Sequence, residues 1–183
     1  MPPEDKDPIQ LLAPTRKSIA LFGAVNLGTG QLLFQLEEKF NAMTFQSFLE
    51  KMLSHRLSDR KLVGILDNAK YHHAKLLKPF LRRHRKQLKL EFLPAYSPEL
   101  NPIERVWKLT RRLCTHNRYF SQLADLLDAV SGQLALWKEP NDTLRKLWGQ
   151  SGFLKGLVPE IGPFFGLGPG EKGHPVNALF RIR

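Results

Sequence analysis

Two acidic residues, Asp67 and Glu104, have types and positions that would suit the metal ligands of a phosphodiester-cleaving site. Carboxylates are hard oxygen ligands of the kind that Mg²⁺ prefers. Two such ions about 4 Å apart can activate the attacking oxygen of a phosphodiester displacement and stabilise the leaving oxygen. On spacing alone, an ordinary role is the more frequent one, because Asp67 could cap a turn and Glu104 could be an acid favoured by a helix dipole.

Each acid is expected at the end of a secondary-structure element. The short apolar run Lys61–Leu66 predicts a strand buried on both faces, which puts Asp67 at its carboxyl end. Pro102 suits the first turn of a helix with Asn101 as its N-cap, so Glu104 falls in that first turn. A strand end and a helix start can face each other across a cleft, and the sequence therefore predicts that the two carboxylates converge.

The elements around them alternate between strands and helices. A β-hairpin is expected first, formed by the apolar runs 18–25 and 31–35 with a turn at 28–30. The spacing of apolar residues then predicts a helix at Thr44–His55 with Thr44 as its N-cap. The other expected elements are a helix at Ala74–Arg85, a strand at Leu88–Leu93 and helices at Pro102–Arg112, Ser121–Trp137 and Asn141–Trp148.

Composition divides the chain into three parts. Residues 1–17 form a polar, Pro-rich leader, and residues 18–148 hold the expected elements. Residues 149–183 contain eight Gly and four Pro in thirty-five positions without a sustained period, so little packed structure is expected there.

Basic residues are concentrated in one stretch of the chain. The formal net charge is +11, and the stretch Lys70–Arg118 alone holds thirteen Lys and Arg against three acids. A local excess of this size attracts polyanions, which favours nucleic acid as the partner. No apolar run is long enough to span a bilayer, so no membrane partner is expected, and the single cysteine, Cys114, excludes an intramolecular disulfide. A cytoplasmic location follows as the default.

The sequence around the two acids resembles a known family. The segments VGILDNAKYHHA at 63–74 and FLPAYSPELNPIERVW at 92–107 resemble the bacterial insertion-sequence branch of the mariner superfamily, also described as DDE superfamily endonucleases. The resemblance extends more weakly over about 7–148. It departs from the family at Ala95, where a second proline is more common, and this change affects no ligand.

The resemblance implies a fold, a reaction and a cofactor. The fold would be an α/β, ribonuclease-H-like mixed sheet flanked by helices. Asp67 and Glu104 would be the second and third ligands of two Mg²⁺ or Mn²⁺ ions, as catalytic and metal-binding residues. The chain would then be a transposase catalytic domain that cleaves and joins DNA, acting on element ends and target DNA in a nucleoid-associated location.

The start of the chain does not match the family. The family's first aspartate lies on a central strand well upstream, so we expect that first central strand to be missing and this chain to be inactive by itself. The hairpin would then expose an unpaired edge, which favours aggregation or a partner transposase chain. The alternative function is a non-catalytic remnant that binds DNA or interacts with a transposase.

Several further residues are candidates for orienting the acids or contacting DNA. Asn68 could orient Asp67 or only satisfy a turn, and His72 could orient the carboxylate or contact a phosphate. The helix of Glu104 also carries cationic residues that could track phosphates or form a solvated face. These are Arg105, Lys108, Arg111 and Arg112. Trp107 on the same helix is expected in the core rather than as a base-stacking platform.

A zinc site is the remaining possibility for the histidines and the cysteine. The candidates are His72, His73, His84, His116 and Cys114. Their spacing matches none of the paired patterns that bind zinc, and we therefore do not expect such a site.

Overall fold

The described part of the chain begins with the expected antiparallel hairpin of β1 (Ala20–Asn26) and β2 (Leu32–Glu37). The computed structural model describes residues 19–57, 61–94, 100–149 and 176–181, the last six by their backbone alone. In the turn, the Asn26 side chain accepts hydrogen bonds from the backbone N–H groups of Gly28 and Thr29 at 2.9 and 3.2 Å. Such Asx contacts are a common way to stabilise a tight turn.

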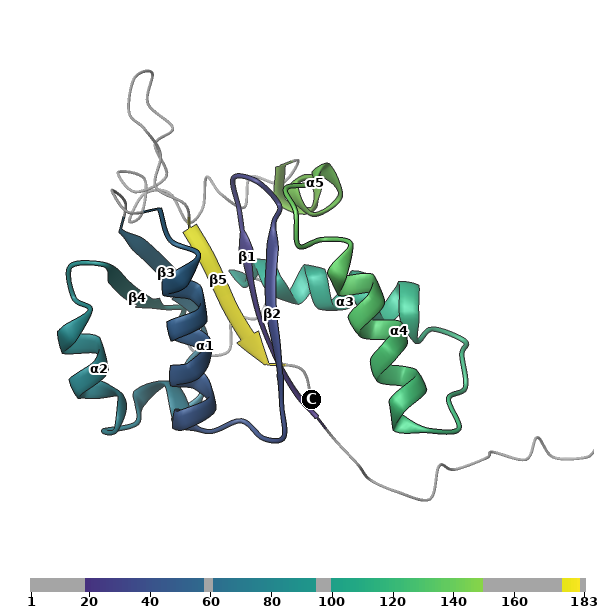
Figure 1. Ribbon diagram of the computed structural model, residues 1–183. Coiled ribbons are helices and arrows are strands. Elements are labelled where there is room, and N and C mark those ends of the chain that lie inside the picture. Colours follow the sequence, from purple (N-terminus) through teal and green to yellow (C-terminus); the bar gives the residue numbers. More distant parts are fainter. Residues whose placement is uncertain (1–18, 58–60, 95–99, 150–175, 182–183) are drawn as a thin grey trace, which may run out of the picture.

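The sheet has five strands in the order β2-β1-β5-β3-β4 (Figure 1). β3 (Leu62–Leu66) and β4 (Leu88–Phe92) are parallel to each other. β5 (Val176–Arg181), from the end of the chain, lies between the two pairs, antiparallel to β1 and parallel to β3. The central position of the sheet is therefore filled by the last described strand.

This placement fills the central position with β5 and corrects the expectation that the hairpin has an unpaired edge, although β5 is not the upstream strand that the resemblance implies. It also differs from the expectation of little packed structure for 149–183, at least at Val176–Arg181. The thirty-five residues of the tail are rich in Gly and Pro as a whole, but the short run VNALFR within them contains neither residue. Strands of five or six residues are ordinary, and their pairing with distant strands leaves no local pattern. Residues 150–175 lie outside the described part of the chain.

The helices fall close to their expected positions, with two local differences. α1 (Ala42–Ser54) is capped by Asn41, whose side chain accepts from the N–H groups of Met43 and Thr44, so Asn41 replaces Thr44 as the N-cap. The expected helix at 74–85 is shorter, since α2 spans Leu77–Arg83, and a 3₁₀ turn, η1 (Lys70–His73), precedes it. The remaining helices are α3 (Pro102–Cys114), α4 (Leu123–Ala135) and α5 (Asp142–Gly149). No helix in the described ranges is both long enough and apolar enough to cross a bilayer.

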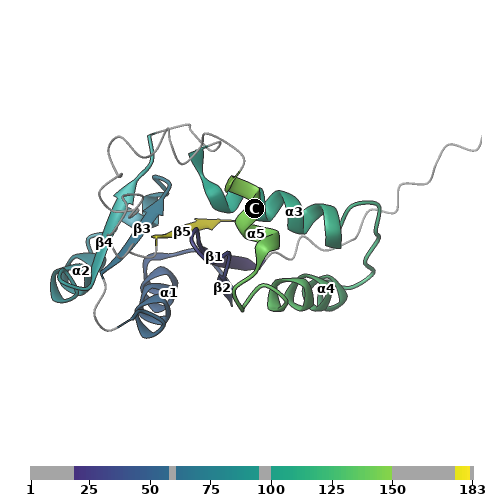
Figure 2. The ribbon, with the colours of Figure 1, turned by 90° about the horizontal axis from the view of Figure 1, so that it is seen from above.

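Helices cover both faces of the sheet, as the view from above shows (Figure 2). Two consecutive residues of β1 contact helices on opposite faces of the sheet, because side chains alternate between the two faces of a strand. The Phe22 ring packs against Phe48 of α1, with 5.6 Å between ring centroids. Its neighbour Gly23 faces α3, where a Cβ atom would overlap the Trp107 ring. Trp107 is fully buried, so its expected place in the core is confirmed.

α5 holds the turn of the hairpin and the end of α3 together. The Trp148 indole N–H donates to the backbone oxygen of Leu27 at 2.8 Å. The Asn141 side chain donates to the backbone oxygen of Gly30 at 2.9 Å and accepts from the N–H of Leu144. Gly30 has φ +74°, and a Cβ there would overlap the Asn141 carbonyl, so only glycine fits this close approach.

Candidate metal and nucleic-acid site

Asp67 follows directly after β3, whose five residues are all buried, as the apolar run predicted. One carboxylate oxygen, Oδ1, accepts a hydrogen bond from the backbone N–H of Ala69 at 3.0 Å. The Nδ1 atom of His72 lies 3.2 Å from the same oxygen and 3.0 Å from the Asp67 backbone oxygen. Because both of these oxygens are acceptors, Nδ1 must carry the proton. The Asp67 side chain is nonetheless 44% exposed, so it remains accessible to a ligand.

The side chain of His72 is buried. Its ring lies 4.4 Å from the Phe45 ring of α1 and 4.3 Å from the Tyr71 ring, between centroids. These contacts fix the orientation of the imidazole. His72 can therefore hold Asp67 in one orientation, the kind of support that metal-binding carboxylates commonly receive.

Asn68 joins the ends of two neighbouring strands. Its side-chain amide donates to the backbone oxygen of Leu93, just beyond β4, and its Oδ1 lies 3.2 Å from Nε2 of His73. Asn68 thus fixes the loop that carries Asp67, and both groups of its side-chain amide are used in these contacts.

Glu104 lies in the first turn of α3, as the sequence predicted. Burial raises the pKa of its carboxyl group, the charge of Arg111 lowers that pKa, and the charge of Asp67 raises it. Because burial and like charge both disfavour the ionised form, a bound cation would relieve the repulsion and lower the pKa.

The cationic residues of α3 divide into two groups. The Arg105 guanidinium donates to the backbone oxygen of Leu147 at 2.6 Å, which ties α3 to α5. Lys108, Arg111 and Arg112 are exposed on the same helix. The structure therefore gives Arg105 a packing role that the sequence did not indicate, and it leaves the other three accessible to a polyanion.

The two carboxylates have no third acidic companion in the part of the chain that the structure describes. Within 19–57, 61–94, 100–149 and the backbone of 176–181, no group of three or more His, Cys, Asp or Glu side chains could hold a metal ion. β5 runs between β3 and β1 and contacts α3, but its sequence contains no acid. Among the described residues, Asp67 and Glu104 are thus the two carboxylates that this site could offer to a hard cation.

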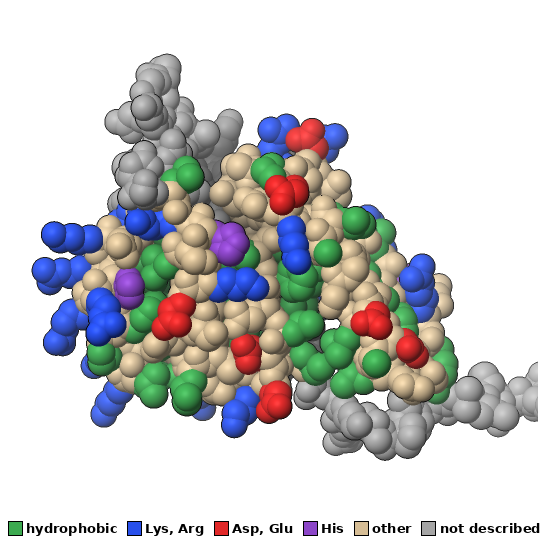
Figure 3. All heavy atoms as spheres, in the orientation of Figure 1, with side chains coloured by type: hydrophobic (Ala, Val, Ile, Leu, Met, Phe, Trp, Pro, Cys, Tyr) green, Lys and Arg blue, Asp and Glu red, His purple; other side chains and the backbone are tan. Residues whose placement is uncertain are grey.

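A second surface, formed by α2 and the residues around it, is strongly basic. Lys and Arg side chains gather over α2 in the space-filling view (Figure 3). No acid occurs between Lys70 and Lys89. We call the exposed residues Lys75, Lys78, Arg82, Arg83, Arg85 and Lys86 the α2 basic surface. None of the six forms a salt bridge with the described residues, so their charges remain available to a partner.

Comparison with known proteins identifies the family. The model of the DDE superfamily endonucleases matches residues 2–127, which include Asp67, Glu104 and the α2 basic surface. The chain belongs to the DDE superfamily endonucleases. It is also 26% identical over 110 residues to the insertion element IS630 uncharacterized 39 kDa protein of Shigella sonnei. That match covers 60% of this chain and 32% of the relative, so the chain spans about a third of the relative's length.

Membership of this endonuclease family agrees with the resemblance seen around the two acids. Two features of the site were not found by sequence reasoning. The burial of His72 against Phe45 could not be seen, because the two residues are far apart in sequence. The central position of β5 has no local signal at all.

Proposed function

We propose that this DDE endonuclease chain belongs to the mariner-like insertion-sequence branch and serves DNA transposition by metal-dependent phosphoryl transfer. The proposal is supported by the family match over residues 2–127, together with the positions of Asp67 directly after β3 and Glu104 in the first turn of α3. The basic surface on α2 supports DNA as the substrate. The acting protein would be cytoplasmic and nucleoid-associated, with element ends and target DNA as its partners.

A ribonuclease-H-like arrangement is part of the same proposal. The mixed sheet has a central strand that is antiparallel to one neighbour and parallel to the other, with helices on both faces. The two carboxylates come from a strand next to the central strand and from a helix packed on the sheet. Such placement at the carboxyl end of a strand is common for sites in α/β sheets.

Each residue of the proposed site would have a separate role. Asp67 and Glu104 would hold Mg²⁺ or Mn²⁺, which supplies Lewis-acid activation of water and stabilises the leaving oxygen. His72 would keep the Asp67 carboxylate in place by donating from Nδ1, and Asn68 would fix the loop between the ends of β3 and β4. The exposed Lys108, Arg111 and Arg112 would hold the phosphate backbone near the site.

We further propose that this chain binds one metal ion and DNA but does not cleave DNA by itself. Two carboxylates can hold one hard cation, whereas in-line displacement between two ions needs a further ligand to fix the second ion. A partner transposase chain could provide it. The alternative function, a non-catalytic protein that binds DNA or interacts with a transposase, would show the same DNA binding without any role for the two acids.

Metal binding tests the proposal directly. The chain is expected to bind one Mn²⁺, and Asp67→Asn or Glu104→Gln is expected to weaken binding by about tenfold or more, because each removes a charged ligand. Electron paramagnetic resonance of free Mn²⁺ during a titration measures both affinity and stoichiometry. Asp128→Asn, an exposed acid on α4, is the matched control and should bind as the unaltered chain does. Equal affinity in all four proteins would refute a metal role for the two acids.

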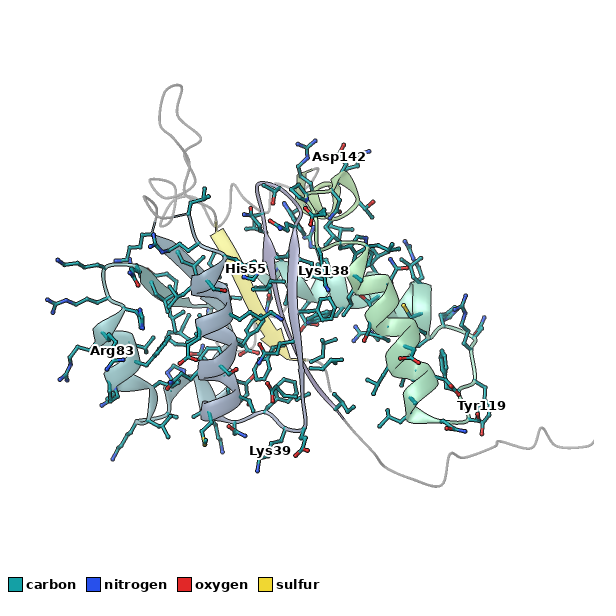
Figure 4. All side chains as sticks on the ribbon, viewed as in Figure 1. Lys39, His55, Arg83, Tyr119, Lys138 and Asp142 are labelled. Carbon is teal, nitrogen blue, oxygen red and sulfur yellow. The ribbon has the colours of Figure 1, made fainter. Side chains whose placement is uncertain are left out.

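DNA binding by the α2 basic surface gives a second test. Figure 4 labels Arg83 on α2, at the left of the view. The triple variant Lys78→Gln, Arg82→Gln, Arg83→Gln is expected to reduce the slope of log affinity against log salt by about 2 to 3. The reason is that each phosphate contact on duplex DNA contributes about 0.9 to that slope.

The matched control removes the same charge elsewhere. Lys39, Lys138 and Lys146 are exposed residues outside α2, and their replacement by Gln should change the slope less than the α2 variant does. Fluorescence anisotropy on one duplex at several salt concentrations measures all three proteins. If the two triple variants lower the slope equally, net charge rather than the α2 basic surface binds DNA.

A further inference from the structure

The sheet is held together by a strand that arrives from the far end of the chain. β1 and β3 are buried along almost their whole length, and neither pairs with the other. β5 pairs with β1 through five residue positions, from Phe22↔Arg181 to Asn26↔Asn177, and with β3 through four, from Val63↔Val176 to Leu66↔Leu179. Without β5, the sheet would separate into two two-stranded parts with unpaired backbone groups facing a slot between them.

An empty slot of this kind is unfavourable. Unpaired backbone N–H and C=O groups cost free energy when they are shielded from water, and open strand edges pair readily with other chains. The slot between β1 and β3 therefore requires a strand. It needs one about six residues long that can form hydrogen bonds along both of its edges, parallel to β3 and antiparallel to β1.

The strand that fills the slot is distant in sequence from the rest of the described fold. Residues 150–175 separate β5 from α5. The other described strands and helices all precede residue 150, so a β5 strand from a second copy would meet the same partners. Exchange of such a terminal element between copies is a low-cost route to association.

We propose that the slot between β1 and β3 is a strand-binding site that β5 fills from within its own chain and that β5 of a second copy can fill in its place. The tether raises the effective concentration of the chain's own strand to the millimolar range, so a dilute chain closes on itself. Exchange becomes dominant when the chain's own strand is disabled. The inference does not depend on the proposed function, since it uses only strand pairing.

The test disables β5 in the full chain and offers the strand again as a peptide. Ala178→Pro removes a backbone donor in the middle of a strand that is paired on both sides, and the melting temperature is expected to fall by about 10 °C. Ala178→Ser keeps the donor and serves as the matched control. A labelled peptide of residues 174–183, the strand a second copy would supply, is then expected to bind the Pro variant saturably and restore its melting temperature.

A peptide with the same Ala178→Pro change is the control ligand and should neither bind nor stabilise. If the Pro variant is insoluble, refolding it with the unaltered peptide should increase the soluble yield, and refolding it with the Pro peptide should not. An unchanged melting temperature in the Pro variant would show that β5 does not complete the sheet. A lowered melting temperature that neither peptide restores, or equal effects of the two peptides, would show that the slot does not accept a strand from a second copy.

Discussion

Phe180→Asp is expected to tighten Mn²⁺ binding by about tenfold or more and to raise the stoichiometry from one ion towards two. Position 180 pairs with Gly23 of β1. Gly23 faces Ile103 and Trp107, the neighbours of Glu104 on α3. Residues paired across two strands share a face of the sheet, so position 180 belongs by register to the face that carries α3. Titration followed by electron paramagnetic resonance measures the change.

The parallel pairing of β3 and β5 points to the same position. Leu66 pairs with Leu179, so the next residues in register are Asp67 and Phe180. Phe180→Asn has the same shape as the aspartate variant without the charge, and it should bind Mn²⁺ as the unaltered chain does. Equal affinities of the Asp and Asn variants would show that position 180 is not beside the two carboxylates. If the Asp variant also nicks DNA with Mn²⁺, and loses this activity with Asp67→Asn, a third carboxylate is what the site lacks.

Trp107→Ala is expected to lower the free energy of unfolding by about 3–5 kcal/mol, the usual cost of removing a buried Trp side chain. Trp107 is fully buried between α3 and β1, where Gly23 leaves room for its ring. Domains of this kind are commonly stable by only about 5–15 kcal/mol, so the variant would lose a large share of its stability. Urea denaturation followed by circular dichroism gives the difference.

Trp107→Phe serves as the milder comparison. It retains an aromatic ring and removes an indole N–H that has no hydrogen-bond partner among the described residues. Its loss of stability should therefore be smaller than that of Trp107→Ala. The opposite interpretation of Trp107 as a base-stacking platform requires that both variants keep their stability and lose affinity for single-stranded DNA.

The elements that present the two acids could be predicted because their signals are local. An apolar run that ends at Asp67 and a proline two residues before Glu104 are visible within a few positions. The hairpin could also be predicted from the sequence, because its two strands are joined by a short turn. The N-cap of α1 was placed three residues too late because both Asn41 and Thr44 can accept from the helix N-terminus, and the two in fact form a reciprocal capping box.

The features that could not be predicted depend on contacts between distant parts of the chain. Arg105 resembles a DNA-contacting residue by its type and neighbours, but its guanidinium is used to hold Leu147. The 3₁₀ turn at Lys70–His73 was not anticipated, and its residues Tyr71 and His72 pack against Phe45, which is distant in sequence. β5 is the largest such case, because a short run in a Gly-rich tail gives no indication of the strands that it joins.

The position of β5 also determines when the protein can fold during its synthesis. Its partners β1 and β3 are completed by residue 66, whereas β5 begins at residue 176. A ribosome adds about 5–20 residues each second, so these two strands wait roughly 5–20 s for the strand that joins them. During that interval the nascent chain presents two open strand edges together with the apolar faces beside them. We therefore expect chaperones to bind the growing chain between the emergence of β3 and its release from the ribosome, and premature termination in the tail to yield aggregates.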